Sequence, residues 1–162
     1  MAFADTGLDK HIVQGWFACK VTLTRACKVG DVIGVAEDSF DDLGPVNANE
    51  SGHATTVTYL PRFVAGETGE AAEIITAYPI AVVQGTGITG GFASNAMKKV
   101  YCLGAGLTSV TANQASTKAG RVSETEATHA GSCTSIVGIE LDTDRVLLFP
   151  GFRSPADLVA TA

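Results

Sequence analysis

The chain has 162 residues, of which 46% are hydrophobic and 17% are charged, and its formal net charge at pH 7 is −6. This length suits one domain, and the mean hydropathy of +0.23 is too high for a disordered protein. The acidic balance disfavours contact with nucleic acid and with anionic membranes, so we expect neither as a partner.

The sequence favours synthesis in a reducing cytoplasm. No apolar run approaches the roughly 18 residues of a transmembrane helix, and residues 1–7 lack the basic and apolar regions of a signal peptide. None of the four cysteines (Cys19, Cys27, Cys102 and Cys133) forms a C-x-x-C pair. We therefore expect small buried hydrophobes rather than disulfides or zinc ligands.

Residues 1–15 are predicted to form an irregular N-terminal arm, because turn formers precede any regular pattern. After residue 15, apolar and polar side chains begin to alternate. Apolar side chains at every second position from 17 to 23 predict a half-buried strand, with Phe17, Cys19, Val21 and Leu23 on one face. We expect a domain over 16–151 and a C-terminal tail over 152–162.

The middle of the chain continues with short strands separated by turns. A turn at 28–31 leads into a short buried strand at 32–36, and a polar loop rich in Asp, Asn, Gly and Pro is predicted over 37–53. Residues 55–64 alternate again and carry many β-branched and aromatic side chains, which favours a strand that ends in a turn at 65–70.

Four further strand-like runs follow, and helical signals are few. The run at 74–83 is interrupted by Pro79, which suggests an edge or a break. Strands are also expected at 99–103, 136–141 and 145–149, with an extended loop over 107–120.

Residues 92–98 have room for about two helical turns, and Ser154-Pro155 resembles a helix start. The prediction is an all-β protein, a compact barrel or sandwich with an irregular N-terminal arm and a short helical C-terminal tail.

A glycine-rich segment, Gly85-Thr-Gly-Ile-Thr-Gly90, matches the G-x-G-x-x-G pattern of dinucleotide sites. Such a site also needs a long helix after the third glycine and an acidic residue about 20 positions later. Neither follows, since the next acidic residue is Glu124. A loop that is mobile or ordered by a partner is the favoured interpretation, and we expect no cofactor.

No constellation of residues indicates catalysis or metal binding. The acidic run 37–42 lacks the spacing of a calcium loop and suits a solvated turn. His11, His53 and His129 are scattered without a metal-binding spacing, and no G-x-S-x-G elbow is present. Lys28 and Arg25 beside Cys27 suggest a lowered thiol pKa, but no partner base is evident. The chain is not expected to be an enzyme.

Several short motifs occur in an order that resembles that of a known protein class. Cys27-Lys-Val-Gly-Asp-Val32 is followed much later by Lys99-Val-Tyr-Cys-Leu-Gly104, then by Lys118-Ala-Gly-Arg-Val122, Ile136-Val-Gly-Ile139 and Arg145-Val-Leu-Leu-Phe-Pro-Gly151. This order, over residues 25–151, resembles the small β-barrel decoration (cement) proteins of tailed-bacteriophage heads. Residues 123–133 are longer than that pattern and depart from it.

The resemblance implies a non-enzymatic virion protein on the outer capsid surface that bridges major capsid protein subunits. It also implies self-association, most commonly as a homotrimer. Apolar residues outside the main strand pattern are the candidates for capsid contact: Phe3, Leu8, Ile12, Val13, Trp16, Phe152 and Leu158. Trp16 and Phe17 also suit a core position, which we weigh first because most large aromatic residues are buried.

Two other functions stay open. A different structural module, such as a domain of a phage tail, a fibre or a surface appendage, has the same short strands and would assemble into filaments. A small-molecule or nucleotide binder that uses the glycine loop at 85–91 is a distant third, because no acid–base pair accompanies that loop.

Overall fold

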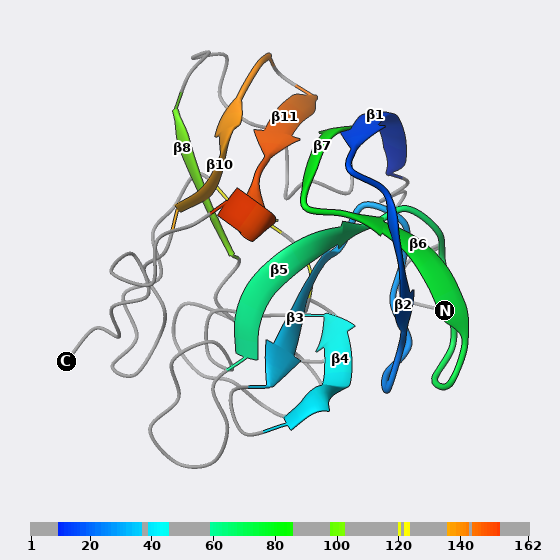
Figure 1. Cartoon of the computed structure of the whole chain (residues 1–162). Coiled ribbons are helices and arrows are strands. Elements are labelled where there is room, and N and C mark those ends of the chain that lie inside the picture. The colour runs from blue at the N-terminus through cyan, green and yellow to red at the C-terminus, as the bar shows by residue number, and fades with distance from the viewer. Residues whose placement is uncertain are drawn as a thin grey trace, which may run out of the picture.

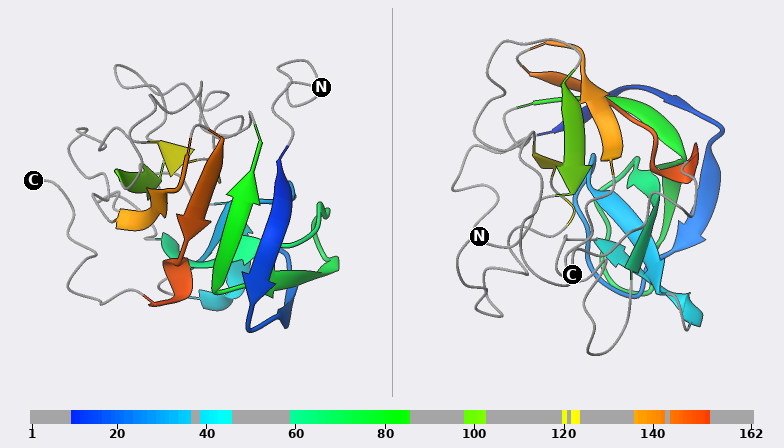
Figure 2. Two further views of the ribbon diagram at one scale, coloured as in Figure 1. Left: turned by 90° about the horizontal axis from the view of Figure 1, so that it is seen from above. Right: turned by 90° about the vertical axis from the view of Figure 1, so that its left-hand side faces the viewer.

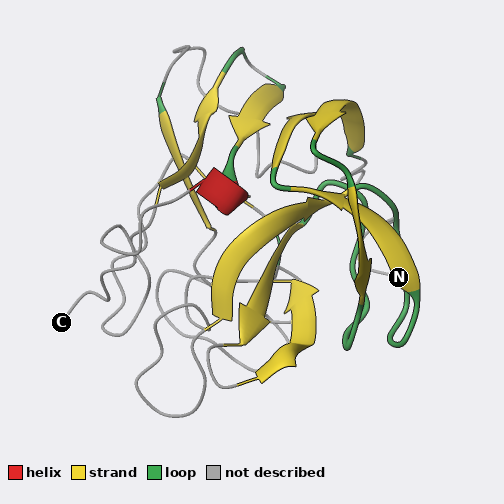
Figure 3. Cartoon of the chain, viewed as in Figure 1, coloured by secondary structure: helices red, strands yellow, loops and turns green. Residues whose placement is uncertain are grey.

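The computed structural model describes residues 10–36, 39–45, 59–85, 98–102, 120, 122–123, 136–142 and 144–152. Within these residues the chain is folded mainly into β-strands, and the helical part is a single 3-10 turn, η1 (Pro150–Phe152) (Figure 3). The all-β prediction is confirmed. The predicted helices at 92–98 and after Ser154 fall almost wholly outside the described residues.

The strands form two antiparallel sheets (Figure 1). The larger sheet has the order β1 (His11–Trp16), β7 (Ile80–Gln84), β11 (Arg145–Leu148), β10 (Ile136–Glu140), β8 (Lys99–Cys102) and β9 (Val122–Ser123). The smaller sheet has the order β2 (Cys19–Thr22), β6 (Ile74–Tyr78), β5 (Tyr59–Ala65), β3 (Val32–Ala36) and β4 (Ser39–Pro45).

A bent two-stranded ribbon joins the sheets. Strand β1 pairs with β7 in the larger sheet, and the next strand along the chain, β2, pairs with β6 in the smaller one. One arm of this ribbon bends at Phe17 and Ala18, and the other bends at Pro79. Proline cannot donate a ladder hydrogen bond, so it suits a position where one strand ends and the next begins. The interruption predicted at Pro79 is therefore confirmed.

Alternate residues of the smaller sheet supply two hydrophobic clusters. Val32 and Val64 belong to the larger cluster, whereas their neighbours Ile33 and Ala65 belong to the smaller one, as the two-residue period of a strand requires. The larger cluster is completed mostly by valines of the six-stranded sheet: Val83, Val100, Val122, Val137 and Val146. The smaller cluster also contains Leu23, Cys27, Ile75 and Ala77.

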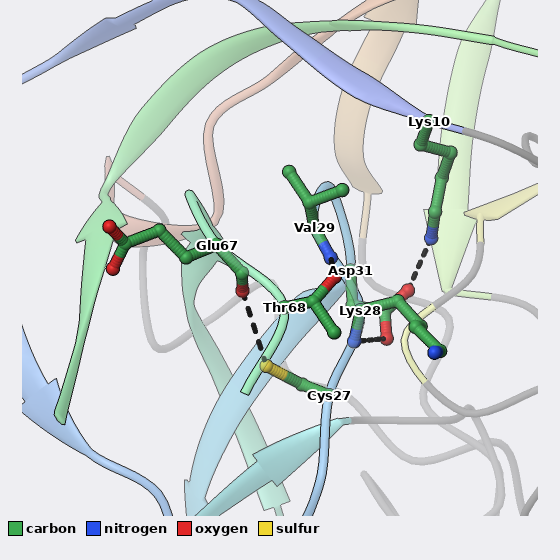
Figure 4. A network of polar contacts seen from close by, with 7 residues as sticks. All are labelled: Lys10, Cys27, Lys28, Val29, Asp31, Glu67 and Thr68. Carbon is green, nitrogen blue, oxygen red and sulfur yellow. Dashed lines mark hydrogen bonds and ion pairs between the residues drawn. The ribbon is translucent and has the colours of Figure 1, made fainter. Parts of the chain in front are cut away.

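A buried ion pair fixes the start of β1 to the start of β3 (Figure 4). The ammonium of Lys10 contacts Asp31 Oδ1, and both side chains are almost fully buried, with 2% and 3% exposed. The other carboxylate oxygen, Oδ2, accepts a hydrogen bond of 2.9 Å from the Lys28 backbone N–H. Asp31 thus stabilises the turn that precedes β3 and also binds Lys10 at the start of β1 in the larger sheet.

Two glycines make this arrangement possible. Gly30 has φ 81° in the turn that the Asp31 N–H closes with the Lys28 carbonyl at 3.0 Å. Gly120 also has φ 81°, and its carbonyl accepts a 2.7 Å bond from Val32 N–H. A Cβ at Gly120 would lie 2.6 Å from Asp31 Cβ, so only glycine fits against the buried carboxylate there.

The prediction of an irregular arm through residue 15 is wrong for residues 11–15. Strand β1 begins at His11 and pairs with β7 from Gln84 to Ile80. A bulge between Ile12 and Gln14 shifts the register, so the exposed side chains fall at positions 11, 13, 14 and 16. This spacing breaks the simple alternation by which a strand is recognised in a sequence. Residues 1–9 lie outside the described residues.

The polar loop predicted over 37–53 is also wrong in part. Ser39–Pro45 forms strand β4, which pairs with β3 at the edge of the smaller sheet. Asp and Pro are depleted from strands, but an edge position tolerates both of them. The predicted strands at 32–36, 136–141 and 145–149 are confirmed within one residue at each end, as β3, β10 and β11.

Removing one partner of the Lys10–Asp31 pair should strongly destabilise the protein. Lys10→Met leaves an uncompensated buried carboxylate, and we expect a loss of about 3–5 kcal/mol in the free energy of unfolding. The measurement is urea denaturation at pH 7. The double variant Lys10→Met/Asp31→Leu removes both charges and should recover part of that loss.

The exposed pair of Arg145 and Asp142 provides the matched control. Arg145→Gln should change the urea midpoint little, because solvent already screens that pair. Equal effects of Lys10→Met and Arg145→Gln would contradict the structural role of the buried pair.

Candidate functional site

Three exposed aromatic residues lie at or beside the bend of the ribbon, and we call Trp16, Phe17 and Phe152 the aromatic corner. Their exposed fractions are 37%, 71% and 61%. The rings of Phe17 and Phe152 have centroids 5.8 Å apart and planes tilted by 57°. Two segments far apart in the sequence therefore present one apolar contact area to solvent.

The turn η1 is held against the bend by close backbone packing. The N–H of Gly151 donates to the Pro79 carbonyl at 3.0 Å, and the Phe152 N–H donates to the Phe149 carbonyl at 3.1 Å. A Cβ on Gly151 would lie 2.3 Å from Pro79 Cβ, so glycine is required for this approach. This packing places Phe152 next to Phe17, the residue that follows the end of β1.

Phe17 has a backbone conformation that phenylalanine rarely adopts. Its φ is 60°, in the left-handed region, which costs a non-glycine residue about 1–2 kcal/mol. The side chain recovers little of this cost by burial, since most of it stays in solvent. Strained residues of this kind often mark functional positions.

The residues proposed for capsid contact have different positions in the structure. Phe152 packs against Phe17, Trp16 is the residue before Phe17 at the end of β1, and Val13 is 48% exposed on β1. Ile12 is half-buried and packs against the larger core cluster. Phe3, Leu8 and Leu158 lie outside the described residues. The contact role of every one of these residues stays a prediction.

The core interpretation of Trp16 and Phe17 is wrong, since both side chains are exposed, and the alternation pattern gave no sign of the exposure of Phe17. Leu23, Cys19 and Val21 do turn toward the smaller core cluster, as predicted for that face. The chain, however, leaves strand geometry between Trp16 and Cys19, so Phe17 does not share their direction. No glycine or proline marks residues 16–19 as a bend, so the sequence carries no local signal for it.

The suggestion of an activated thiol at Cys27 is contradicted. Burial, together with the smaller effect of the negative charge of Asp31, raises the pKa of Cys27 to about 12. The Sγ atom lies 3.8 Å from the Glu67 carbonyl oxygen (Figure 4). Burial also raises the pKa of Cys19, which is half-buried beside Ala77. Both are free thiols.

The remaining candidates lie mostly beyond the described residues. Of the glycine segment 85–91 only Gly85 is described, and its N–H donates to the Asp144 carbonyl at 3.0 Å. His11 is exposed on β1, whereas His53 and His129 are not described. In the described ranges no three His, Cys, Asp or Glu side chains gather as metal ligands.

The comparisons with family models, with curated proteins and with solved structures find no match to this chain. The described part of the chain contains no helix with the length and apolarity needed to cross a membrane.

The Cys27 thiol should resist alkylation in the folded protein. With a pKa of about 12, the reactive thiolate is a minute fraction at pH 8. Iodoacetamide labelling followed by peptide mass spectrometry should show Cys27 unmodified at pH 8 and fully modified in urea. Labelling of the native protein should increase only as the pH rises toward 12. Rapid modification of native Cys27 at pH 8 would contradict its burial.

Proposed function

We propose that this protein is a structural virion protein that decorates the outside of a phage capsid and bridges major capsid protein subunits. The observation that carries the proposal is the aromatic corner, an exposed apolar contact area fixed to a two-sheet body. No cofactor enters the proposal.

The chemistry of the corner suits a protein partner. Aromatic residues are enriched among the few residues that supply most of the binding energy at protein interfaces. Trp16, Phe17 and Phe152 lie on backbone held by strand pairing and by the Gly151–Pro79 hydrogen bond. Little conformational entropy is therefore lost when a partner covers them.

The symmetry and charge of a capsid suit such a protein. A shell repeats the same site many times, so modest contacts by a body that bridges two subunits gain strength through avidity. The net charge of −6 favours the outer surface over the DNA-facing interior, because phosphate groups repel an acidic protein.

A structural module of a tail, fibre or appendage is the second candidate. The observation that favours it is the exposed edge of β1, since fibres and appendages often assemble by adding strands to sheet edges. Such a protein would form filaments, whereas a capsid decoration protein forms closed oligomers. Negative-stain imaging of the purified protein distinguishes the two.

Phe17→Gly should weaken capsid binding and leave the fold intact. Glycine adopts φ 60° without strain, so the free energy of unfolding should stay within about 1 kcal/mol of the wild-type value. Loss of a central aromatic contact should weaken binding about 30-fold. The measurement is co-sedimentation with undecorated heads of the virus that encodes the chain.

Ile74→Thr is the matched control for that experiment. Ile74 is 65% exposed but lies on β6, at the end away from Pro79, and threonine keeps its β-branched shape. This variant should bind as the wild type does. Absence of saturable binding by the wild-type protein would refute the capsid role itself.

A further inference from the structure

The described sheets end in four edge strands, and three of them have protective features. Native proteins block exposed edges with charged residues, with proline or by keeping the strand short. Strand β4 carries Asp41 and Asp42 and ends in Pro45, and β2 carries Lys20. Strand β9 has only two residues.

Strand β1 is the exception. Its six residues contain no Asp, Glu, Lys or Arg, and neither does its neighbour β7. Figure 2 shows β1 as the outermost strand of the six-stranded sheet, and among the described strands none pairs with its outer side. Val13 and Trp16 are exposed large apolar residues on this strand.

One feature of β1 limits where a further strand can add. The bulge between Ile12 and Gln14 interrupts the pairing with β7, but Gln14, Gly15 and Trp16 pair regularly with Val82, Ala81 and Ile80. The second half of β1 thus has regular strand geometry, and its outer backbone groups are free to form a ladder within the described structure.

We propose that two copies of this chain associate through their β1 strands, antiparallel and related by a two-fold axis. The larger sheets of the two copies then continue into each other. Val13, Gln14 and Trp16 of one copy pack against the same strand of the other copy.

The distribution of charge favours a second copy as the occupant of this edge. Each copy carries a net charge of −6, so two copies repel over most of their surfaces. At β1 this repulsion is small, because residues 11–19 are uncharged and the preceding Lys10 is neutralised by Asp31 in the interior. Like charges are not brought together across a β1–β1 contact.

The charges and lengths of the four edge strands also favour a dimer over the homotrimer expected from the resemblance. In a ring of three, β1 would have to pair with a different edge of the next copy. The candidates are β2 with Lys20, β4 with two aspartates, and the two-residue β9. In a two-fold dimer, the uncharged edge of β1 pairs with the same edge of the other copy, so no other edge is needed.

This association is independent of the proposed capsid role, because it involves the free protein alone. Sedimentation equilibrium at several concentrations is the test, and the expected result is a species of twice the 16.6 kDa chain mass. Val13→Lys places like charges opposite each other at the contact and should raise the dimer dissociation constant about tenfold or more. Gln14→Lys changes an exposed polar residue of the same strand and should act in the same direction.

Ile74→Lys is the control, since it adds the same charge to an exposed apolar strand position away from β1. This variant should remain dimeric, and thermal unfolding should show all three lysine variants folded. A monomer at every concentration, a trimer, or a dimer that both β1 variants leave unchanged would each overturn the proposal. A dimer that does not bind capsids would refute the proposed function and leave this inference intact.

Discussion

The bent ribbon made of β1–β2 and β6–β7 is the constraint on which the rest of the structure depends. Because each arm of the ribbon belongs to both sheets, the sheets cannot separate without breaking strand pairing. The buried pair of Lys10 and Asp31 holds one end of β1, and the packing of Gly151 on Pro79 holds the region at the other end. Trp16 and Phe17 of the aromatic corner and the open edge of β1 all lie on this ribbon, so contact surfaces and stability share the same elements.

Strand positions were predictable where residues follow a two-residue period or form short apolar runs, as in β3, β10 and β11. The failures have local physical causes. In β1 the bulge at Ile12–Gln14 hides the alternation, and in β4 the edge position permits a strand of low intrinsic β propensity. How these strands join into two sheets was not predictable, because that depends on contacts between distant segments such as Lys10, Asp31 and Gly120.

Two of the three residues of the candidate site, Trp16 and Phe152, were predictable from the sequence, but the way the three are arranged was not. Trp16 and Phe152 were selected because they lie outside the strand pattern, yet nothing in the intervening sequence indicates that Phe152 packs against Phe17, the neighbour of Trp16. Phe17 was missed for a different reason. Its side chain continues an apolar alternation, and only the left-handed backbone at that position turns it away from the core. A conformation so unusual for phenylalanine is seen only in the folded structure.

The position of Lys10 has a practical consequence for attaching cargo to the protein. Lys10 and His11 lie at the start of β1, whereas Phe152 belongs to the aromatic corner beyond the other end of that strand. Because β1 runs between these two points, they are separated by about 20 Å at the spacing of an extended strand. A label attached at His11 therefore lies about one strand length from the corner, whereas one attached at Phe152 competes with whatever covers it. An attachment that must leave the corner uncovered is better placed at His11.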